Sequence, residues 1–163
     1  MGSSIEITRA EAIHISDIIR IENETFPCPW PEEAFLEEIH FPFSHFLIAQ
    51  TVTGNKNRIP VVVGYIIFWS VADEMQILNI ATSKNSRRCG IGQKLLDVAI
   101  KTALEKKVRI ISLEVRKSNL PAINFYKKNG FGIVGIRRGY YSNNNEDALV
   151  MVLVSNCNNN QLY

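Results

Sequence analysis

The sequence has few cysteines, no long apolar run and no large excess of one charge. Its three cysteines, Cys28, Cys89 and Cys157, lie far apart without the spacing of metal ligands, which argues against a disulfide framework and a metal site. No stretch approaches the ~18 consecutive apolar residues of a membrane helix. The first residues carry neither the basic flank nor the apolar run of a signal peptide. We therefore expect a cytoplasmic chain with no metal and no membrane partner.

Charge and length set two further limits. Lys and Arg number 18 and Asp and Glu number 16, which gives a net charge of +2. Dedicated nucleic-acid binders show a strong basic excess, so we expect no direct nucleic-acid binding. The 163 residues, 46% hydrophobic and 21% charged, suit one ordinary globular domain. We expect a single domain over residues 1–155 and a frayed asparagine-rich tail over residues 156–163.

Hydrophobic periodicity predicts the order of strands and helices. Alternating or β-branched runs predict strands, and apolar residues three or four apart predict helices. The predicted strands are residues 5–8, 46–51, 59–71, 75–82, 108–115, 131–136 and 148–154. The first predicted helix runs to about Glu24, the second opens at Pro31, and the others cover residues 91–106 and 120–129. This order predicts an α+β or α/β fold with a central mixed β-sheet flanked by helices.

Local signals predict where several elements begin and end. Thr8 and Glu11 resemble a capping box at the start of the first helix. Gly130 occupies a C-terminal cap position after the last helix. Polar residues predict a turn at 53–57 and a loop at 140–147 between the last two strands.

A glycine-rich segment, Arg87-Arg-Cys-Gly-Ile-Gly-Gln-Lys94, lies between a predicted strand and an amphipathic helix. Backbone amides at such a helix start form an anion site, and glycines leave room for a phosphate. The spacing fits neither Walker A, because Gln93 follows the second glycine, nor the dinucleotide fingerprint, because Leu95 replaces its third glycine. The alternative is a glycine-rich helix start with solvated arginines.

Glu114 is a carboxylate inside an otherwise apolar strand-like run. Buried carboxylates are costly unless paired, and a partly buried one can act as a general base. The alternative is an outward-facing glutamate that pairs with Arg116 or Arg109. Alternation alone favours this alternative.

Two residues of the following helix also have two interpretations. Asn119 precedes the helix and is either its N-cap or an amide that contacts a cofactor. Tyr126 is either a core residue or a phenol that donates a proton to a leaving thiolate.

Taken in order, these segments resemble the GNAT superfamily, within it the N-terminal α-amine acetyltransferases. The greatest similarity is to the bacterial ribosomal-protein-alanine acetyltransferase family and its archaeal relatives. The matching segments are residues 26–30, 78–81, 87–96, 113–116, 118–119, 122–131, 138–141 and 146–151. The resemblance implies the GNAT fold and transfer of acetyl from acetyl-CoA to a protein N-terminus, with a ribosomal protein as one possible substrate.

The resemblance also implies which residues bind the cofactor and which react. Backbone of the fourth predicted strand would face the pantetheine and the thioester oxygen, and the glycine-rich segment would hold the pyrophosphate. Glu114 would accept a proton, Tyr126 would donate one, and Asn119 would contact the cofactor near its reacting end. The other implied cofactor residues are Ile80, Ala81, Thr82, Arg87, Arg88, Gly90, Gly92, Gln93 and Lys94. The residues implied to line the peptide entrance, from two flanking loops, are Phe26, Trp30, Tyr140 and Tyr141.

Three other functions remain open at this point. A GNAT enzyme acting on a small amine or a lysine side chain is the nearest. A non-catalytic acyl-CoA-binding module would need the glycine-rich segment but not both Glu114 and Tyr126. A nucleotide-binding switch is more distant, because the motif spacing fails. Cys89 departs from the family pattern, and a solvent-facing small residue is favoured there over a reactive thiol.

Overall fold

The structure is a computed structural model that describes residues 4–52, 59–156 and 161–162. These residues form two compact units. Unit 1 comprises Met1–Trp69 and Asn79–Ala99, and unit 2 comprises Ser70–Leu78 and Ile100–Tyr163. Within the described ranges, no helix has the length and apolar character needed to cross a membrane.

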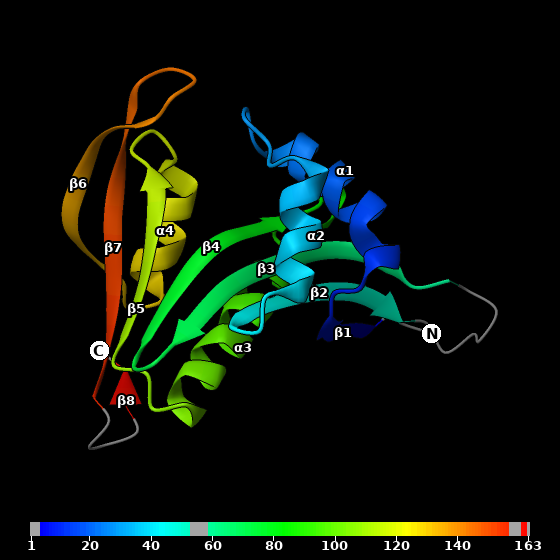
Figure 1. The fold of residues 1–163 in the computed structure, drawn as a ribbon, viewed down its shortest axis with the longest axis horizontal. Coiled ribbons are helices and arrows are strands. Elements are labelled where there is room, and N and C mark those ends of the chain that lie inside the picture. The colour runs from blue at the N-terminus through cyan, green and yellow to red at the C-terminus, as the bar shows by residue number, and fades with distance from the viewer. Residues whose placement is uncertain (1–3, 53–58, 157–160, 163) are drawn as a thin grey trace. The chain divides into compact units, whose positions relative to one another are not determined.

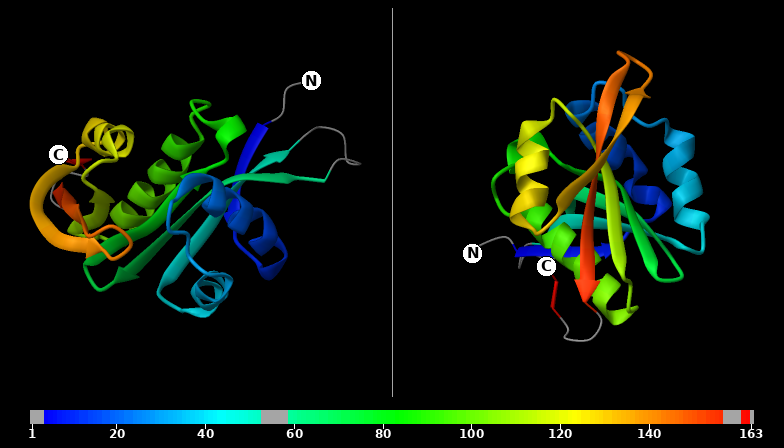
Figure 2. Two further views of the ribbon diagram at one scale, coloured as in Figure 1. Left: turned by 90° about the horizontal axis from the view of Figure 1, so that it is seen from above. Right: turned by 90° about the vertical axis from the view of Figure 1, so that its left-hand side faces the viewer.

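Unit 1 places helices on both faces of a group of strands (Figures 1 and 2). Its strands follow the order β1-β2-β3-β4, with β1–β2 and β2–β3 antiparallel. Figure 2 shows α1 and α2 on one face and the first part of α3 on the other. The elements are β1 (Ser4–Arg9), η1 (Ala12–His14), α1 (Ile15–Thr25), α2 (Glu32–His40), β2 (Ser44–Val52), β3 (Val61–Val71), β4 (Glu74–Thr82), η2 (Lys84–Ser86) and α3 (Ile91–Glu105). The ends of β3 and α3 and the first half of β4 belong to unit 2.

The centre of β3 is buried on both sides. Four consecutive residues, Tyr65, Ile66, Ile67 and Phe68, have no exposed side-chain surface. Successive strand residues point to opposite faces, so a continuous buried run requires cover on both faces. The helices on the two faces of unit 1 meet this requirement.

Unit 2 is a mixed sheet with the strand order β4-β5-β7-β6. β4 and β5 are parallel from Glu74–Ile110 to Ile77–Leu113, whereas β5–β7 and β7–β6 are antiparallel. Its helix α4 (Leu120–Lys128) has two buried residues, Ile123 and Tyr126. The elements are β5 (Ile110–Arg116), α4 (Leu120–Lys128), β6 (Gly132–Tyr141), β7 (Glu146–Asn156) and β8 (Gln161–Leu162). The parallel and antiparallel pairs and the flanking helices confirm the predicted fold class.

Two local predictions are wrong. The first helix begins after Glu11, whose backbone N–H donates to His14 Nδ1 at 3.0 Å, while Thr8 lies within β1 and caps nothing. The polar loop predicted at 140–147 is only residues 142–145. β6 and β7 extend on either side of it because Tyr141 pairs with Glu146 across their ends.

Other predictions concern the chain's ends and one turn. The turn at 53–57 lies outside the described residues. Of the tail, Asn156 ends β7 and residues 161–162 pair with that strand as β8, whereas residues 157–160 and 163 lie outside the described ranges. The single domain over residues 1–155 and the frayed tail stay predictions.

We predict that Gly64→Ala lowers the free energy of unfolding by about 1–3 kcal/mol, as overpacking does. A Cβ at Gly64 would lie 3.0 Å from the Ala81 carbonyl oxygen and 3.0 Å from Ile91 Cγ2, so β3, β4 or α3 must shift. Urea denaturation measures the change. Gly132→Ala is the matched control, because a Cβ there meets nothing within 4 Å. Equal stability of wild type and Gly64→Ala would contradict this packing argument.

Candidate active site

The glycine-rich segment forms the N-terminal start of α3 in unit 1. Arg88 and Gly90 have positive φ angles of 60° and 77°, a backbone conformation that favours glycine. The N–H of Lys94 donates to the carbonyl of Gly90 at 3.0 Å. The N–H groups before it therefore have no acceptor within the helix, as at every helix start. Such N–H groups together with the helix dipole attract an anion.

Charged side chains surround this helix start. Arg87, Arg88 and Lys94 are exposed, and Arg87 Nη2 donates to Thr25 Oγ1 at 3.3 Å. In the described part of the chain, Arg88 and Lys94 have no ion-pair partner. Gln93 Nε2 donates to Asp97 at 2.8 Å, on the first turns of α3. Unpaired cations beside a helix start fit a diphosphate.

The end of β4 offers unpaired backbone. The β4–β5 ladder ends at the Ile77–Leu113 pair, so residues 78–82 are not paired with β5. Ile80 and Thr82 are half-buried and Ala81 is buried. This stretch can therefore form backbone hydrogen bonds with an extended group, as strand edges do.

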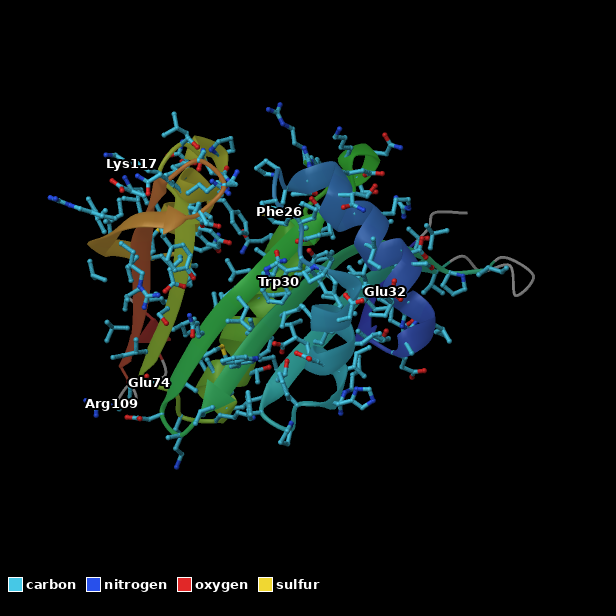
Figure 3. The ribbon with its side chains drawn as sticks, turned by 45° about the horizontal axis from the view of Figure 1, so that its top comes forward. Phe26, Trp30, Glu32, Glu74, Arg109 and Lys117 are labelled. Carbon is cyan, nitrogen blue, oxygen red and sulfur yellow. The ribbon has the colours of Figure 1, made fainter. Side chains whose placement is uncertain are left out.

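The segment between α1 and α2 carries Phe26 and Trp30, both half-buried (Figure 3). The Phe26 N–H donates to the Glu22 carbonyl at 2.9 Å and caps α1. The Trp30 ring lies 5.6 Å from the ring of Phe35 in α2. Trp30 also donates its backbone N–H to the Glu22 carboxylate at 2.9 Å.

Glu22 is a buried carboxylate that our sequence analysis missed. Its side chain is 1% exposed; the Tyr65 hydroxyl and the Asn79 amide donate to it, the latter at 3.2 Å. Burial raises the pKa of Glu22, while the donors at Trp30, Tyr65 and Asn79 oppose this rise. A signal was available: Glu22 stands seven residues after buried Ile15, on the face that should be apolar.

Glu114 in unit 2 is held by two partners. Gln76 Nε2 donates to its Oε2 at 3.1 Å, and Arg137 Nη1 lies 3.2 Å from its Oε1. The Glu114 side chain is only 11% exposed. The alternative pairing with Arg116 or Arg109 is wrong, because those side chains reach Glu146 and Asp73.

Tyr126 lies in a buried aromatic group of unit 2. Its ring is 5.4 Å from that of Phe125 and 5.6 Å from that of Phe131. Burial, and secondarily the neighbouring Tyr141, raise the pKa of Tyr126 far above its ordinary value. Within the described residues of unit 2 its hydroxyl has no hydrogen-bond partner. The phenol is therefore protonated and available as a donor.

Asn119 is the N-cap of α4. Its Oδ1 accepts from the Ala122 N–H at 3.2 Å, which confirms the capping interpretation. Cap residues of this type stabilise helices by about 1 kcal/mol. The nitrogen of the same side-chain amide, Nδ2, has no acceptor among the described residues. A cap role for Oδ1 is therefore compatible with a contact from Nδ2 to a cofactor.

Tyr140 and Tyr141 end β6 and do not lie in a loop, which corrects their predicted location. The Arg116 guanidinium lies 3.7 Å from the Tyr141 ring centroid, and its Nη1 is 2.9 Å from Glu146 Oε2. Burial raises the pKa of Tyr141 to about 12, against the effect of Arg116. Glu146 also accepts from the Ser118 N–H at 2.9 Å. The Glu146 carboxylate thus connects β5, through the ion pair with Arg116, and the start of α4, through the Ser118 N–H, to the β6–β7 hairpin.

Residues 15–131 match the acetyltransferase (GNAT) family. The chain belongs to this family. It is therefore an enzyme that uses acetyl-CoA, and the anion-binding start of α3 suits the pyrophosphate of that cosubstrate. Among the described residues, no group of three or more His, Cys, Asp or Glu could hold a metal ion.

Similar proteins are known from bacteria and archaea. A Bacillus subtilis protein provisionally named a ribosomal protein bS18-alanine N-acetyltransferase is 38% identical, covering 87% of this chain and 90% of that protein. An N-alpha-acetyltransferase of Sulfurisphaera tokodaii is 34% identical, covering 92% and 93%. Two crystal structures are similar as well. They are the Escherichia coli ribosomal-protein-S18-alanine N-acetyltransferase (28% identity, TM-score 0.78, 91% and 92% covered) and Ard1 from Thermoplasma volcanium (30%, 0.81, 92% and 97%).

The implied residues of this acetyltransferase fall into two groups. The glycine-rich segment, residues 87–94, which we call the anion-binding turn for its expected ligand, lies in unit 1. Residues 80–82, Phe26 and Trp30 lie in the same unit. Glu114, Tyr126, Asn119, Tyr140 and Tyr141 are in unit 2. Within unit 2, Tyr141 lies in electrostatic reach of both Glu114 and Tyr126. The roles assigned to these residues stay predictions.

We predict that Glu146→Gln removes a pH-dependent part of the stability. Hydrogen bonds from Ser118, followed by the Arg116 ion pair, lower the pKa of Glu146 to about 2. A depressed carboxyl pKa stabilises the fold above the unfolded value of ~4.3 and loses this effect as the pH falls toward 2. Wild type should therefore exceed the variant in Tm at pH 6, and the difference should vanish between about pH 5 and pH 2.

Thermal unfolding of both proteins across this pH range measures the effect. Glu105→Gln is the control, because its contact with Lys101 is 3.9 Å long and exposed and such pairs contribute little. A Tm difference that persists unchanged at pH 2 would contradict the interpretation.

Proposed function

We propose that this acetyltransferase modifies the N-terminal α-amine of a protein, and that the protein is a ribosomal protein. One observation carries the proposal: relatives that align with nearly the full chain are named for bS18-alanine or N-alpha acetylation. Ribosomal proteins are made in the cytoplasm, which would place the enzyme there.

The cofactor half of the proposal rests on unit 1. Acetyl-CoA supplies an activated acetyl thioester. Backbone N–H groups at the start of α3 would bind its pyrophosphate, with Arg88 and Lys94 adding charge. The unpaired backbone of residues 80–82 would bind the pantetheine and the thioester oxygen, and a donor aimed at developing negative charge is a large catalytic contribution. Asn119 Nδ2 in unit 2 would contact the cofactor near its reacting end.

Proton transfer would rest on Glu114 and Tyr126. A free α-amine has a pKa of ~7.7–8.0, so a base has to remove only one proton. Glu114 would accept this proton through a water, while Gln76 and Arg137 keep its carboxylate in place. Tyr126 would protonate the departing thiolate, and its raised pKa supports this role because the phenol stays protonated.

Aromatic side chains would contact the peptide. Phe26 and Trp30 come from the α1–α2 segment, and Tyr140 and Tyr141 from the end of β6. Tyr140 is exposed and the other three residues are half-buried. All four rings offer apolar area to an extended N-terminal peptide, and the Trp and Tyr rings also carry a polar group.

We predict that Tyr126→Phe lowers kcat by about 10²–10⁴-fold, the range for one general acid or base. Affinity for acetyl-CoA should stay the same, because the hydroxyl is not in the anion-binding turn. Glu114→Gln should lower activity most at low pH, where more of the amine is protonated. Steady-state kinetics from pH 6 to pH 9 measure both.

A control for the loss of a carboxylate is Glu105→Gln, because the Glu105 side chain is exposed and contacts Lys101 on α3. Unchanged kcat in Tyr126→Phe would remove this hydroxyl from the reaction. An unchanged pH profile in Glu114→Gln would make the carboxylate structural.

A peptide panel tests the substrate. Peptides that differ in their first residue, each with an internal lysine, are incubated with acetyl-CoA, and mass spectrometry locates the acetyl group. The proposal predicts acetylation of the α-amine, with Ala-starting peptides among the best. Acetylation confined to lysine side chains would contradict the α-amine proposal, and equal rates for all first residues would contradict a dedicated ribosomal-protein enzyme.

A further inference from the structure

The buried Glu22 carboxylate takes no part in the proposed chemistry. Four hydrogen bonds reach its two oxygens. Trp30 N–H donates to Oε1 at 2.9 Å, Asn79 Nδ2 lies 3.3 and 3.2 Å from Oε1 and Oε2, and the Tyr65 hydroxyl donates to Oε2. The donors come from the α1–α2 segment, β4 and β3, all within unit 1.

The position of Glu22 would suit an apolar residue. It lies on the buried face of α1 with Ile15 and Ile18. Replacing a buried ionic group by a well-packed apolar one is often neutral or stabilising, whereas removing one partner leaves an unsatisfied polar group. Stability alone therefore gives little reason for a carboxylate here, and its effect on the surrounding segments is the more informative property.

Among the described residues, the backbone of the Phe26–Trp30 segment that Glu22 holds makes few other hydrogen bonds, although the Trp30 ring also contacts Phe35. Pro27, Pro29 and Pro31 have no backbone N–H, so three donors are missing from this stretch. The first residue of the segment, Phe26, donates its N–H to the Glu22 carbonyl in α1. Between the flanking prolines, the Trp30 N–H is bound by Glu22.

The same carboxylate also fixes β4. Asn79 is 8% exposed and directly precedes Ile80, where the backbone that would face the thioester begins. A single side chain therefore holds the segment of Phe26 and Trp30 and the end of β4 within unit 1.

We propose that Glu22 is a positioning residue that fixes the peptide-binding segment Phe26–Trp30 relative to the acetyl-binding end of β4. This inference rests on the proposed function, because it assigns the peptide to that segment. Glu22 contacts neither substrate and acts through Trp30 and Asn79.

The chain provides a matched control in Glu38. This carboxylate is 5% exposed and accepts from Ser44 Oγ at 2.5 Å and from Trp69 Nε1 at 2.8 Å. It joins α2 to β2 and β3 in the same unit. Among the described residues, no hydrogen bond links Glu38 to the Phe26–Trp30 segment or to β4. Glu38 is therefore a buried carboxylate like Glu22 that does not bind these two segments.

The test compares Glu22→Gln with Glu38→Gln. Glutamine keeps the shape of glutamate but has one acceptor oxygen in place of two, so one oxygen position loses its donors. It also lacks the negative charge, so any hydrogen bond that remains from the Trp30 N–H is weaker than the charge-assisted bond to the carboxylate. We expect the KM for an α-amine peptide to rise about tenfold in Glu22→Gln, with the KM for acetyl-CoA within twofold. In Glu38→Gln both KM values should stay within twofold even where the Tm falls.

Hydrogen exchange gives a second readout that needs no turnover. The Trp30 amide should exchange faster in Glu22→Gln than in wild type, and at the wild-type rate in Glu38→Gln. Tyr65→Phe serves if Glu22→Gln does not fold, since it keeps the carboxylate and removes one donor. It should raise the peptide KM by a smaller factor.

The outcomes separate the two proposals. If the wild type acetylates no α-amine, the proposed function is overturned. Hydrogen exchange at the Trp30 amide then still tests whether Glu22 holds the Phe26–Trp30 segment. Wild type that acetylates α-amines, with peptide KM and Trp30 exchange unchanged in Glu22→Gln, overturns the positioning role. An equal rise of the peptide KM in Glu38→Gln also overturns it, because the effect would then follow from any lost buried carboxylate.

Discussion

A carboxylate removed from water destabilises a fold by several kcal/mol unless hydrogen-bond donors surround it. Glu22, Glu38 and Glu114 all lie in this situation, and each meets donors from more than one element. Glu22 joins α1, the α1–α2 segment, β3 and β4. Glu38 joins α2, β2 and β3, and Glu114 joins β5 to β4 and β6. The requirement to satisfy these oxygens therefore fixes, within each unit, the elements that carry the candidate site.

The proposed cofactor binding and proton transfer would depend on different physical features. The anion-binding turn would use backbone: Gly64 allows β3 to lie close to Ile91 and Leu95 of α3, and positive φ angles at Arg88 and Gly90 shape the turn. In the proposed reaction, proton transfer would rely on two side chains of unit 2, Tyr126 and Glu114. Burial keeps Tyr126 protonated, while Gln76 and Arg137 orient Glu114. Under this proposal the first feature would suit any acyl-CoA, and the second would suit an amine acceptor.

Local patterns predicted most of the fold, and long-range contacts account for the errors. Periodicity located α3 and β4 to within one or two residues, and the resemblance identified the family. The predicted polar loop was too long because Tyr141 pairs with Glu146 across β6 and β7. Glu22 was missed because its partners Tyr65 and Asn79 stand 43 and 57 residues later. Likewise, the Arg137 partner of Glu114 is across the sheet in β6, which no spacing in the sequence indicates.

The most direct measurement is the structure of a ternary complex with CoA and a peptide that begins with alanine. The central claim is that Glu114 and Tyr126 serve an N-terminal amine. It predicts the peptide α-nitrogen within one bridging water of Glu114, and the CoA sulfur within hydrogen-bond distance of the Tyr126 hydroxyl. A peptide bound with its N-terminus away from Glu114, or a sulfur out of reach of Tyr126, would contradict the claim.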